Sequence, residues 1–212
     1  VLSLAFTQVT AQDFDKGYEA YQAGDYATAQ KEWKPLAEQG DAEAQSWLGF
    51  IYQEGEGVLK DATEAVKWYR LAAEQGNVSA QFYLGLMYKN GNGVLKDATE
   101  AVKWFRLSAE QGHTLAQSSL GFMYIEGKSI LQDFPEAVKW YRLAAEQGDA
   151  SAQLGFGMLY QYGLGVLQDN QTAHMWYNIV SANGNKEAGG HRDKLEALMP
   201  ASEITKATAM AK

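Results

Sequence analysis

The stretch that decides the fold is residues 62–76, which read ATEAVKWYRLAAEQG. Nearly the same letters return as ATEAVKWFRLSAEQG at residues 98–112 and as FPEAVKWYRLAAEQG at residues 134–148, so each copy begins 36 residues after the previous one. Self-similarity at a fixed period of this length is the signature of a repeat protein. One repeat cannot bury its apolar face alone, and stacking on the next repeat does so. The sequence therefore predicts an array of equivalent units.

The first copy reads as an amphipathic helix with its own start and stop signals. Asp61 is expected to accept hydrogen bonds from free backbone amides, and Glu64 favours the positive end of the helix dipole. Gly76 is typical of the left-handed residue that ends a helix. A weak surface pair between Arg70 and Glu74, worth about 0.3 kcal/mol, is expected on the outer side. The side chains expected to be buried are Ala65, Trp68, Tyr69 and Ala72.

A second helical pattern precedes each copy and is separated from it by a glycine-containing loop. Its apolar residues recur at helical spacing, and Gly49 is expected to let a neighbouring backbone come close. The face of the first such helix consists of Ala44, Leu48, Ile51, Tyr52 and Gly55. Each 36-residue unit is therefore predicted to hold two helices, with a first helix and a second helix joined by a loop.

Taken together, these motifs resemble the Sel-1-like repeat (SLR) family, a relative of the tetratricopeptide repeats, over about residues 13–188. The resemblance implies an all-α fold, an α/α solenoid in which helix-turn-helix repeats form a right-handed superhelix. Four full repeats are expected at residues 44–79, 80–115, 116–151 and 152–187. Residues 12–43 resemble a leading repeat of the tetratricopeptide type with a shortened loop, because Asp25 directly follows Gly24.

The last repeat departs from the others on its outer side. Uncharged or weakly basic residues replace the earlier Val, Lys, Arg and Glu, so another part of the chain is expected to cover this surface. The replacing residues are His174, Met175, Asn178 and Ala182. Residues 188–212 are predicted to supply capping helices, one over residues 186–199 with Leu195, Leu198 and Met199 on one side, and a short final helix with Ser202 as its N-cap.

The first eleven residues differ from the repeats. An apolar stretch ends in Val9-Thr10-Ala11, with small residues at the −3 and −1 positions of a cut after Ala11, as in a secretory signal peptide. Residues 1–11 are therefore predicted to be a signal-peptide remnant or tail of a secreted or periplasmic protein. The alternative is an ordinary N-terminal segment. An apolar extended tail would also suit a neighbouring molecule's groove, which gives the hypothesis of self-association through residues 1–11.

Composition excludes several classes of function. The 212 residues carry a formal net charge of −8, and no segment gathers the basic face that nucleic acid requires. The chain has no Cys, and His113, His174 and His191 stand apart, so neither a zinc site nor another metal site is expected. Every apolar stretch stops short of the roughly 18 residues that cross a membrane. No cofactor is expected.

Motifs that would carry catalysis fail on their requirements. Gly127-Lys128-Ser129 lacks the glycine that a phosphate loop needs five positions earlier, where Phe122 stands. Some cysteine-rich SLR proteins are described as binding or hydrolysing β-lactams, so the resemblance makes a β-lactamase-like or penicillin-binding enzyme the rival function. The chain contains no Ser-x-x-Lys nucleophile motif. No catalytic residues are predicted.

Differences between the repeats separate scaffold from surface. Positions that vary along the first helices are free to specify a ligand, and the resemblance implies that these helices line a concave face. Trp47 and Tyr83 are expected to be aromatic anchors there, and the alternative is that both are inter-repeat packing residues. The predicted concave-face residues are Trp47, Gln53, Tyr83, Lys89, Ser119, Ile125 and Tyr162. The column formed by Phe50, Leu86, Phe122 and Met158 is expected to be core.

The function expected from these features is that of a non-enzymatic scaffold or adaptor, which holds a protein or peptide in its concave groove. The frequent bacterial use of the family leads to the expectation of an exported bacterial protein acting in host interaction or envelope assembly. A regulatory subunit that tethers an envelope enzyme is a further alternative.

Overall fold

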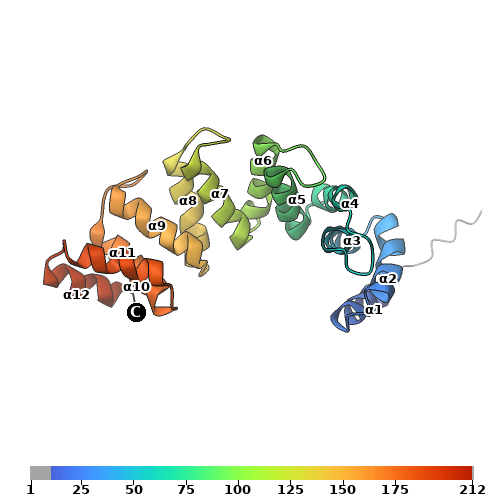
Figure 1. Cartoon of the computed structure of the whole chain (residues 1–212), viewed down its shortest axis with the longest axis horizontal. Helices are drawn as coiled ribbons and strands as arrows, with labels where there is room; N and C mark the ends of the chain where they lie inside the picture. Colours follow the sequence, from blue (N-terminus) through green and yellow to red (C-terminus); the bar gives the residue numbers. More distant parts are fainter. Residues whose placement is uncertain (1–10, 212) are drawn as a thin grey trace, which may run out of the picture. The chain divides into compact units, whose positions relative to one another are not determined.

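The computed structural model describes residues 11–211, and these residues are helical apart from short connections (Figure 1). Within this part of the chain there is no strand, so the predicted all-α class is confirmed. The helices are α1 (Ala11–Gln22), α2 (Tyr26–Glu38), α3 (Ala42–Glu54), α4 (Ala62–Glu74), α5 (Val78–Asn90), α6 (Ala98–Glu110), α7 (Thr114–Glu126), α8 (Phe134–Glu146), α9 (Ala150–Tyr162), α10 (Asn170–Ala182), α11 (Lys186–Glu196) and α12 (Ala201–Met210). The predicted signal remnant lies outside the described residues, except for Ala11, which begins α1.

The chain divides into two compact units, residues 1–111 and residues 112–212. In the first, the described helices α1 to α6 contact one another in chain order, and in the second, α7 to α10 do the same. First helices of consecutive repeats also touch, α3 with α5 and α7 with α9. Each unit is therefore a stack of helix pairs, and its core is the seam between successive pairs.

The predicted helix ends of the repeat are confirmed. The Asp61 carboxylate accepts from the backbone amides of Thr63 and Glu64 at 2.9 and 3.0 Å, and Gly76 has the positive φ of 91° that glycine adopts most readily. The predicted pair between Arg70 and Glu74 is wrong. Arg70 instead donates to the Tyr88 hydroxyl at 2.5 Å, and so ties α4 to the first helix of the next repeat.

Helix pairs approach closely because glycines on the first helices face aromatic rings. A Cβ on Gly49 would lie 2.6 Å from the ring of Tyr69, and one on Gly121 would lie 2.3 Å from the ring of Tyr141. Gly49 does allow a close approach, as expected, but the group that approaches it is the ring of Tyr69 and not a neighbouring backbone. All four side chains predicted to be buried in α4 are buried, at 0–7% exposure. Tight ring-to-backbone packing of this kind holds the two helices of a pair at a fixed distance.

Buried glutamines link the two helices of a repeat and tie the repeat to the one before it. The Gln45 amide donates to the Ala37 carbonyl at 2.9 Å, and its oxygen accepts from Gln75 at 2.8 Å. The same bond joins Gln147 to Gln117 at 2.8 Å. A buried amide is stable only when it is hydrogen-bonded, so the repeated glutamines are scaffold.

The C-terminal helices cover the last repeat, since α11 and α12 both contact α10. His174 is fully buried there, and its Nε2 lies 2.8 Å from the Glu196 carboxylate. Two details differ from the prediction. Leu198 is 77% exposed because α11 ends at Glu196, and α12 begins at Ala201 with Pro200 at the N-cap, so Ser202 lies inside the helix. A proline suits this place because it has no amide hydrogen to leave unpaired.

Candidate functional site: a pocket between first helices

A cavity of about 350 Å³ lies between the first helices of the first unit. Its lining comes from α1, α3 and α5 and consists of Tyr21, Glu43, Ser46, Trp47, Phe50, Ser79 and Tyr83. We call this cavity the aromatic pocket. Four of its residues are aromatic, two are serines and one is acidic, so it combines an apolar body with a few polar groups, as ligand pockets do.

The rings form one continuous wall. The Trp47 ring lies 5.0 Å from that of Tyr21 and 6.0 Å from that of Phe50, and Phe50 lies 6.3 Å from Tyr83. These centroid distances fall within the range of favourable aromatic contacts. The wall therefore runs from α1 across α3 to α5.

Trp47 and Tyr83 pack between helices and also line the aromatic pocket. Trp47 stacks on the fully buried Trp33 at 5.1 Å, and Tyr83 stacks on the fully buried Tyr69 at 5.3 Å. Both rings are half-buried, and both line the aromatic pocket. One face of each ring therefore packs between helices while the remainder faces the cavity.

Helix caps hold α3 and α5 in place around the pocket. Asp41 caps α3 by accepting from Ala44 at 2.8 Å, and Asn77 caps α5 by accepting from Ala80 at 2.9 Å. The same Asn77 donates through Nδ2 to the Glu43 carboxylate at 3.1 Å. Asn77 thus both starts α5 and fixes an acidic group at the edge of the pocket.

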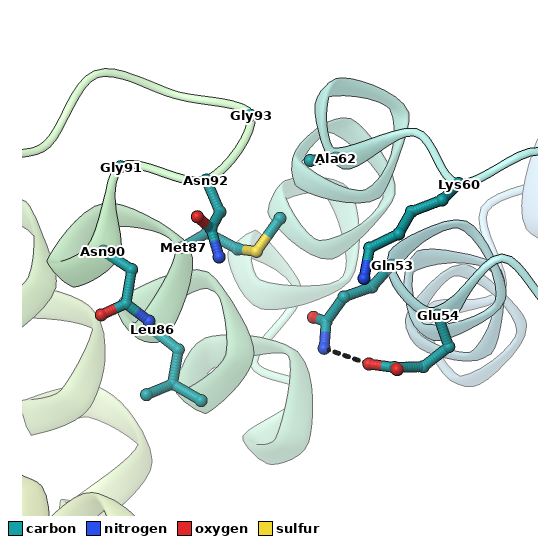
Figure 2. Close-up of a pocket in the computed structure, with 10 residues that line it drawn as sticks. All are labelled: Gln53, Glu54, Lys60, Ala62, Leu86, Met87, Asn90, Gly91, Asn92 and Gly93. Atoms are coloured by element: carbon teal, nitrogen blue, oxygen red, sulfur yellow. Dashed lines mark hydrogen bonds between the residues drawn. The ribbon is translucent and has the colours of Figure 1, made fainter.

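A second cavity, of about 510 Å³, is lined by the C-terminal parts of α3 and α5, the loops that follow them and the start of α4 (Figure 2). We call it the loop pocket. Gln53 and Glu54 line it from α3 and Leu86 from α5, and Gln53 donates to the Glu54 carboxylate at 2.8 Å. The whole lining is Gln53, Glu54, Lys60, Ala62, Leu86, Met87, Asn90, Gly91, Asn92 and Gly93. Both pockets have lining residues on α3 and α5, and we call the two pockets together the groove between α3 and α5.

Carboxylates give the neighbourhood of the aromatic pocket a negative potential. Burial, together with the adjacent Glu56 carboxylate, raises the pKa of Tyr21 to about 12, and the charge of Glu54 acts in the same direction. One Glu56 oxygen is buried without a hydrogen-bond partner. Burial also raises the pKa of Tyr69, again with a contribution from Glu54.

The structure places the seven predicted binding residues in both units. Trp47 and Tyr83 line the aromatic pocket, and Gln53 lines the loop pocket. Lys89 is half-buried on α5 and is not among the lining residues of either cavity. The remaining three belong to the second unit, where Ser119 and Ile125 are half-buried on α7 and Tyr162 is 59% exposed at the end of α9.

The prediction that the column from Phe50 to Met158 is core was wrong. Phe50 and Leu86 line the two pockets, Phe122 is 44% exposed, and Met158 is half-buried. Phe50 and Leu86 therefore border open cavities rather than a sealed interior. An apolar column alone does not distinguish these two environments.

Sequence reasoning also missed Tyr21, Glu43, Ser46 and Ser79. Glu43 carried a usable signal, since its counterparts one, two and three repeats later are Ser79, Leu115 and Ser151. A varying position near the start of a first helix is as free to specify a ligand as Trp47. Tyr21 carried no such signal, because the shortened loop of the leading repeat places it outside the 36-residue spacing of the other repeats.

Other chemistry finds little support in the described part of the chain. Between residues 11 and 211, no group of three or more His, Cys, Asp or Glu side chains is arranged to hold a metal ion. None of the helices α1 to α12 is both long and apolar enough to cross a membrane. His113 accepts through Nδ1 from the Ala116 amide at 3.2 Å, which makes it the N-cap of α7.

Comparison with known proteins identifies the repeats. The Sel1 repeat family matches residues 42–77, 78–113, 114–149 and 150–185. None of the curated proteins compared with the chain matches it. Sel1 repeat proteins are generally protein-interaction scaffolds.

Solved structures agree with this assignment. A Sel1 repeat protein from Oxalobacter formigenes is 35% identical, with a TM-score of 0.83 over 93% of this chain and 84% of that one. A protective antigen of uropathogenic Escherichia coli with an SLR fold is 30% identical, with a TM-score of 0.57 over 94% of this chain and 51% of that one. A Sel1 repeat protein from Klebsiella pneumoniae, 21% identical with a TM-score of 0.55 over 90% of this chain and 98% of that one, shares the fold. The chain is an all-α solenoid protein that belongs to the Sel1 repeat family.

Proposed function

We propose that this protein is a non-enzymatic scaffold that holds a peptide segment of a partner protein in the groove between α3 and α5. The observation that carries the proposal is the aromatic pocket, in which Trp47 and Tyr83 are half-buried by packing and still face a cavity. Interface hot spots have this character, since they are large aromatic residues whose position is fixed before the partner arrives.

The size of the groove supports a peptide ligand. The two cavities, of about 350 and 510 Å³, follow one another along the same pair of helices. Each is comparable to the pocket of a small ligand, and in succession they suit several side chains of an extended segment. Polar groups at intervals, such as Ser46, Gln53 and Asn90, are available to hydrogen-bond its backbone.

Selection from a displayed library of random peptides tests this function. Peptides selected on the whole chain are expected to bind the wild type and to lose about tenfold or more in affinity for Phe50→Ser, because an aromatic wall residue is removed. Leu71→Ser, on the exposed side of α4, is the matched control and is expected to bind as the wild type does. Selected peptides that tolerate Phe50→Ser but not Leu71→Ser would place binding on the second helices and contradict the proposal.

Export and a role in host interaction or envelope assembly form the finer part of the proposal. The motif ending at Ala11 supports export, and the likeness to a protective antigen of a pathogen supports a surface or host role. Immunoblots of cytoplasm, envelope and medium, made with an antibody to the repeats, test it. Protein confined to the cytoplasm would contradict export.

A further inference from the structure

The lining of the aromatic pocket includes one carboxylate, that of Glu43, and no Lys or Arg. Lysines already lie over the rings of second helices, with Lys67 5.3 Å from the ring centre of Trp68 and Lys139 4.4 Å from that of Trp140. Within residues 14–211, Trp47 has aromatic neighbours and no cation over its ring. The negative face of a ring attracts a cation, so this wall offers an unused site of that kind.

Glu43 is the charged residue of the lining, and its exposed carboxylate accepts a hydrogen bond that orients it. Asn77 donates to its carboxylate at 3.1 Å, and Asn77 is itself fixed as the N-cap of α5. The other polar groups of the lining, the hydroxyls of its two serines and two tyrosines, are neutral. A carboxylate beside aromatic rings is the arrangement that pairs with a guanidinium or ammonium group.

Two further carboxylates near the pocket act in the same direction as Glu43. The negative charges of Glu54 and Glu56 both reach the Tyr21 hydroxyl, whose ring is part of the wall. A cation entering the pocket would therefore meet attraction from the rings, from Glu43 and from these two acids. An acidic side chain would meet repulsion from each of them.

We propose that the aromatic pocket binds a basic side chain, arginine or lysine, of the partner's peptide segment, with the rings of Trp47 and Tyr83 against its cation and the Glu43 carboxylate as its counter-ion. The inference rests on the proposed function and adds the chemistry of the residue that is recognised. The pocket's 350 Å³ accommodates a long side chain together with part of its backbone.

Titration of the whole chain with three capped amino acids tests this chemistry. N-acetyl-arginine methylamide is the basic probe, the citrulline analogue is its neutral counterpart of the same shape, and the norleucine analogue is apolar. Binding is followed by the indole N–H signal of Trp47 in NMR spectra, assigned with Trp47→Phe. The arginine probe is expected to bind about fivefold or more tightly than either of the others, and to weaken as salt is added.

Glu43→Gln separates the carboxylate from the rings. Glutamine still accepts from Asn77, so the local structure is kept, while the negative charge is lost. The arginine probe is expected to lose about fivefold in affinity and the citrulline probe to be unchanged. The control is Glu74→Gln, which removes an exposed carboxylate from α4 and is expected to change neither titration.

Two results would overturn the inference. Equal binding of the arginine, citrulline and norleucine probes would show that the pocket takes side chains without regard to charge, which leaves the scaffold function standing. No change in the Trp47 signal with the arginine probe would show that the pocket does not take a basic side chain at all. Failure of the proposed scaffold function would give a different result, because peptides selected on the wild type would then bind the Phe50→Ser variant with unchanged affinity.

Discussion

At the position that Trp47 holds in α3, helix α7 carries Ser119, and at the position that Tyr83 holds in α5, helix α9 carries Gly155. Glu43 is likewise replaced by Leu115. Beneath these positions the two units are alike, since Leu48 and Leu120 are both buried in their first helices, at 1% and 0% exposure. At these three positions the same scaffold thus carries two aromatic residues and an acid in one unit, and Ser, Gly and Leu in the other.

The second-helix tyrosines show how the faces come to differ. In the first unit the buried ring of Tyr69 stacks on the ring of Tyr83 at 5.3 Å, and Tyr83 in turn lines the groove. Tyr141 instead lies against Gly155, where a Cβ would be 2.4 Å from its ring, and no second ring follows. The residue at this single repeat position, Tyr83 or Gly155, therefore decides whether a second ring extends the seam between helices toward the first-helix surface. Specificity can change at such positions without rebuilding the core.

The largest expected effect tests whether the scaffolds are equivalent. Leu48→Ala and Leu120→Ala each remove a buried side chain at the same repeat position and are each expected to lower the free energy of unfolding by about 3 kcal/mol. Urea unfolding followed by circular dichroism measures both. Leu→Met at each position is the volume-conserving control and should cost less than about 1.5 kcal/mol. A loss in one unit at least twice that in the other would break the comparison.

The next effect tests whether the faces differ in packing. Trp47→Ala is expected to cost about 2 kcal/mol, because the ring stacks on Trp33 on one side and faces the pocket on the other. Ser119→Ala, at the same position of α7, is expected to change stability by less than about 0.5 kcal/mol. Thermal and urea unfolding measure both variants. A cost for Trp47→Ala as small as that of Ser119→Ala would show that the tryptophan does not contribute to packing.

A smaller effect on stability, which depends on pH, is expected to distinguish the N-caps of the first helices in the two units. Asp41 and Asn77 cap in the first unit, whereas His113 caps α7 in the second and must be neutral at Nδ1 to accept a hydrogen bond. Burial holds the pKa of His113 below its usual value of 6.5. Above pH 6.5 the imidazole is neutral in both the folded and the unfolded protein. As the pH falls below 6.5, the unfolded chain takes up the proton before the folded protein does. The folded state therefore loses stability until the pH reaches the lower pKa of the folded state.

The measurement compares the wild type with His113→Asn, which keeps a capping side chain that does not titrate. Between about pH 7 and about pH 5 the wild type is expected to lose roughly 1 kcal/mol more than the variant, the usual worth of an N-cap. Unfolding midpoints in urea at each pH supply the two curves. Parallel curves would mean that the histidine cap contributes no pH dependence.

The smallest effect concerns a position that is the same in both units. Leu59, Leu95, Leu131 and Leu167 are 89–91% exposed. Changing any one of them to Ser is expected to alter the free energy of unfolding by less than about 0.5 kcal/mol, because almost no apolar area is removed from a packed environment. A loss above 1 kcal/mol, measured by urea unfolding, would show that the loop leucine packs.

Local signals made the scaffold predictable. Asp61, Gly76 and the buried face of α4 follow from capping and helical periodicity alone, because each depends on neighbours within one or two turns. Arg70 was misplaced because its partner, Tyr88, lies in the next repeat. Leu198 was misplaced because α11 ends two residues before it, and helix ends are the least certain part of such a prediction.

The candidate site was predictable only in part. Trp47 and Tyr83 stood out because they vary between repeats and are large, but their double role depends on the distance to Trp33 and Tyr69 across helices. The sequence indicates a core position for Phe50 because an apolar residue at helical spacing gives the same pattern whether it fills an interior or lines a pocket. The groove exists only once α3 and α5 lie side by side.

Site-specific photo-crosslinking tests the central claim most directly, that the partner is held on the first-helix face of the first unit. A benzophenone amino acid replaces Leu86 in the loop pocket, Phe122 at the counterpart of Phe50 in the second unit, or Leu71 on the exposed side of α4. The probe is a peptide selected on the wild-type chain. We expect the adduct at position 86 to exceed those at positions 122 and 71 by about tenfold. Adducts of equal yield at all three positions, or a maximum at position 71, would contradict the account.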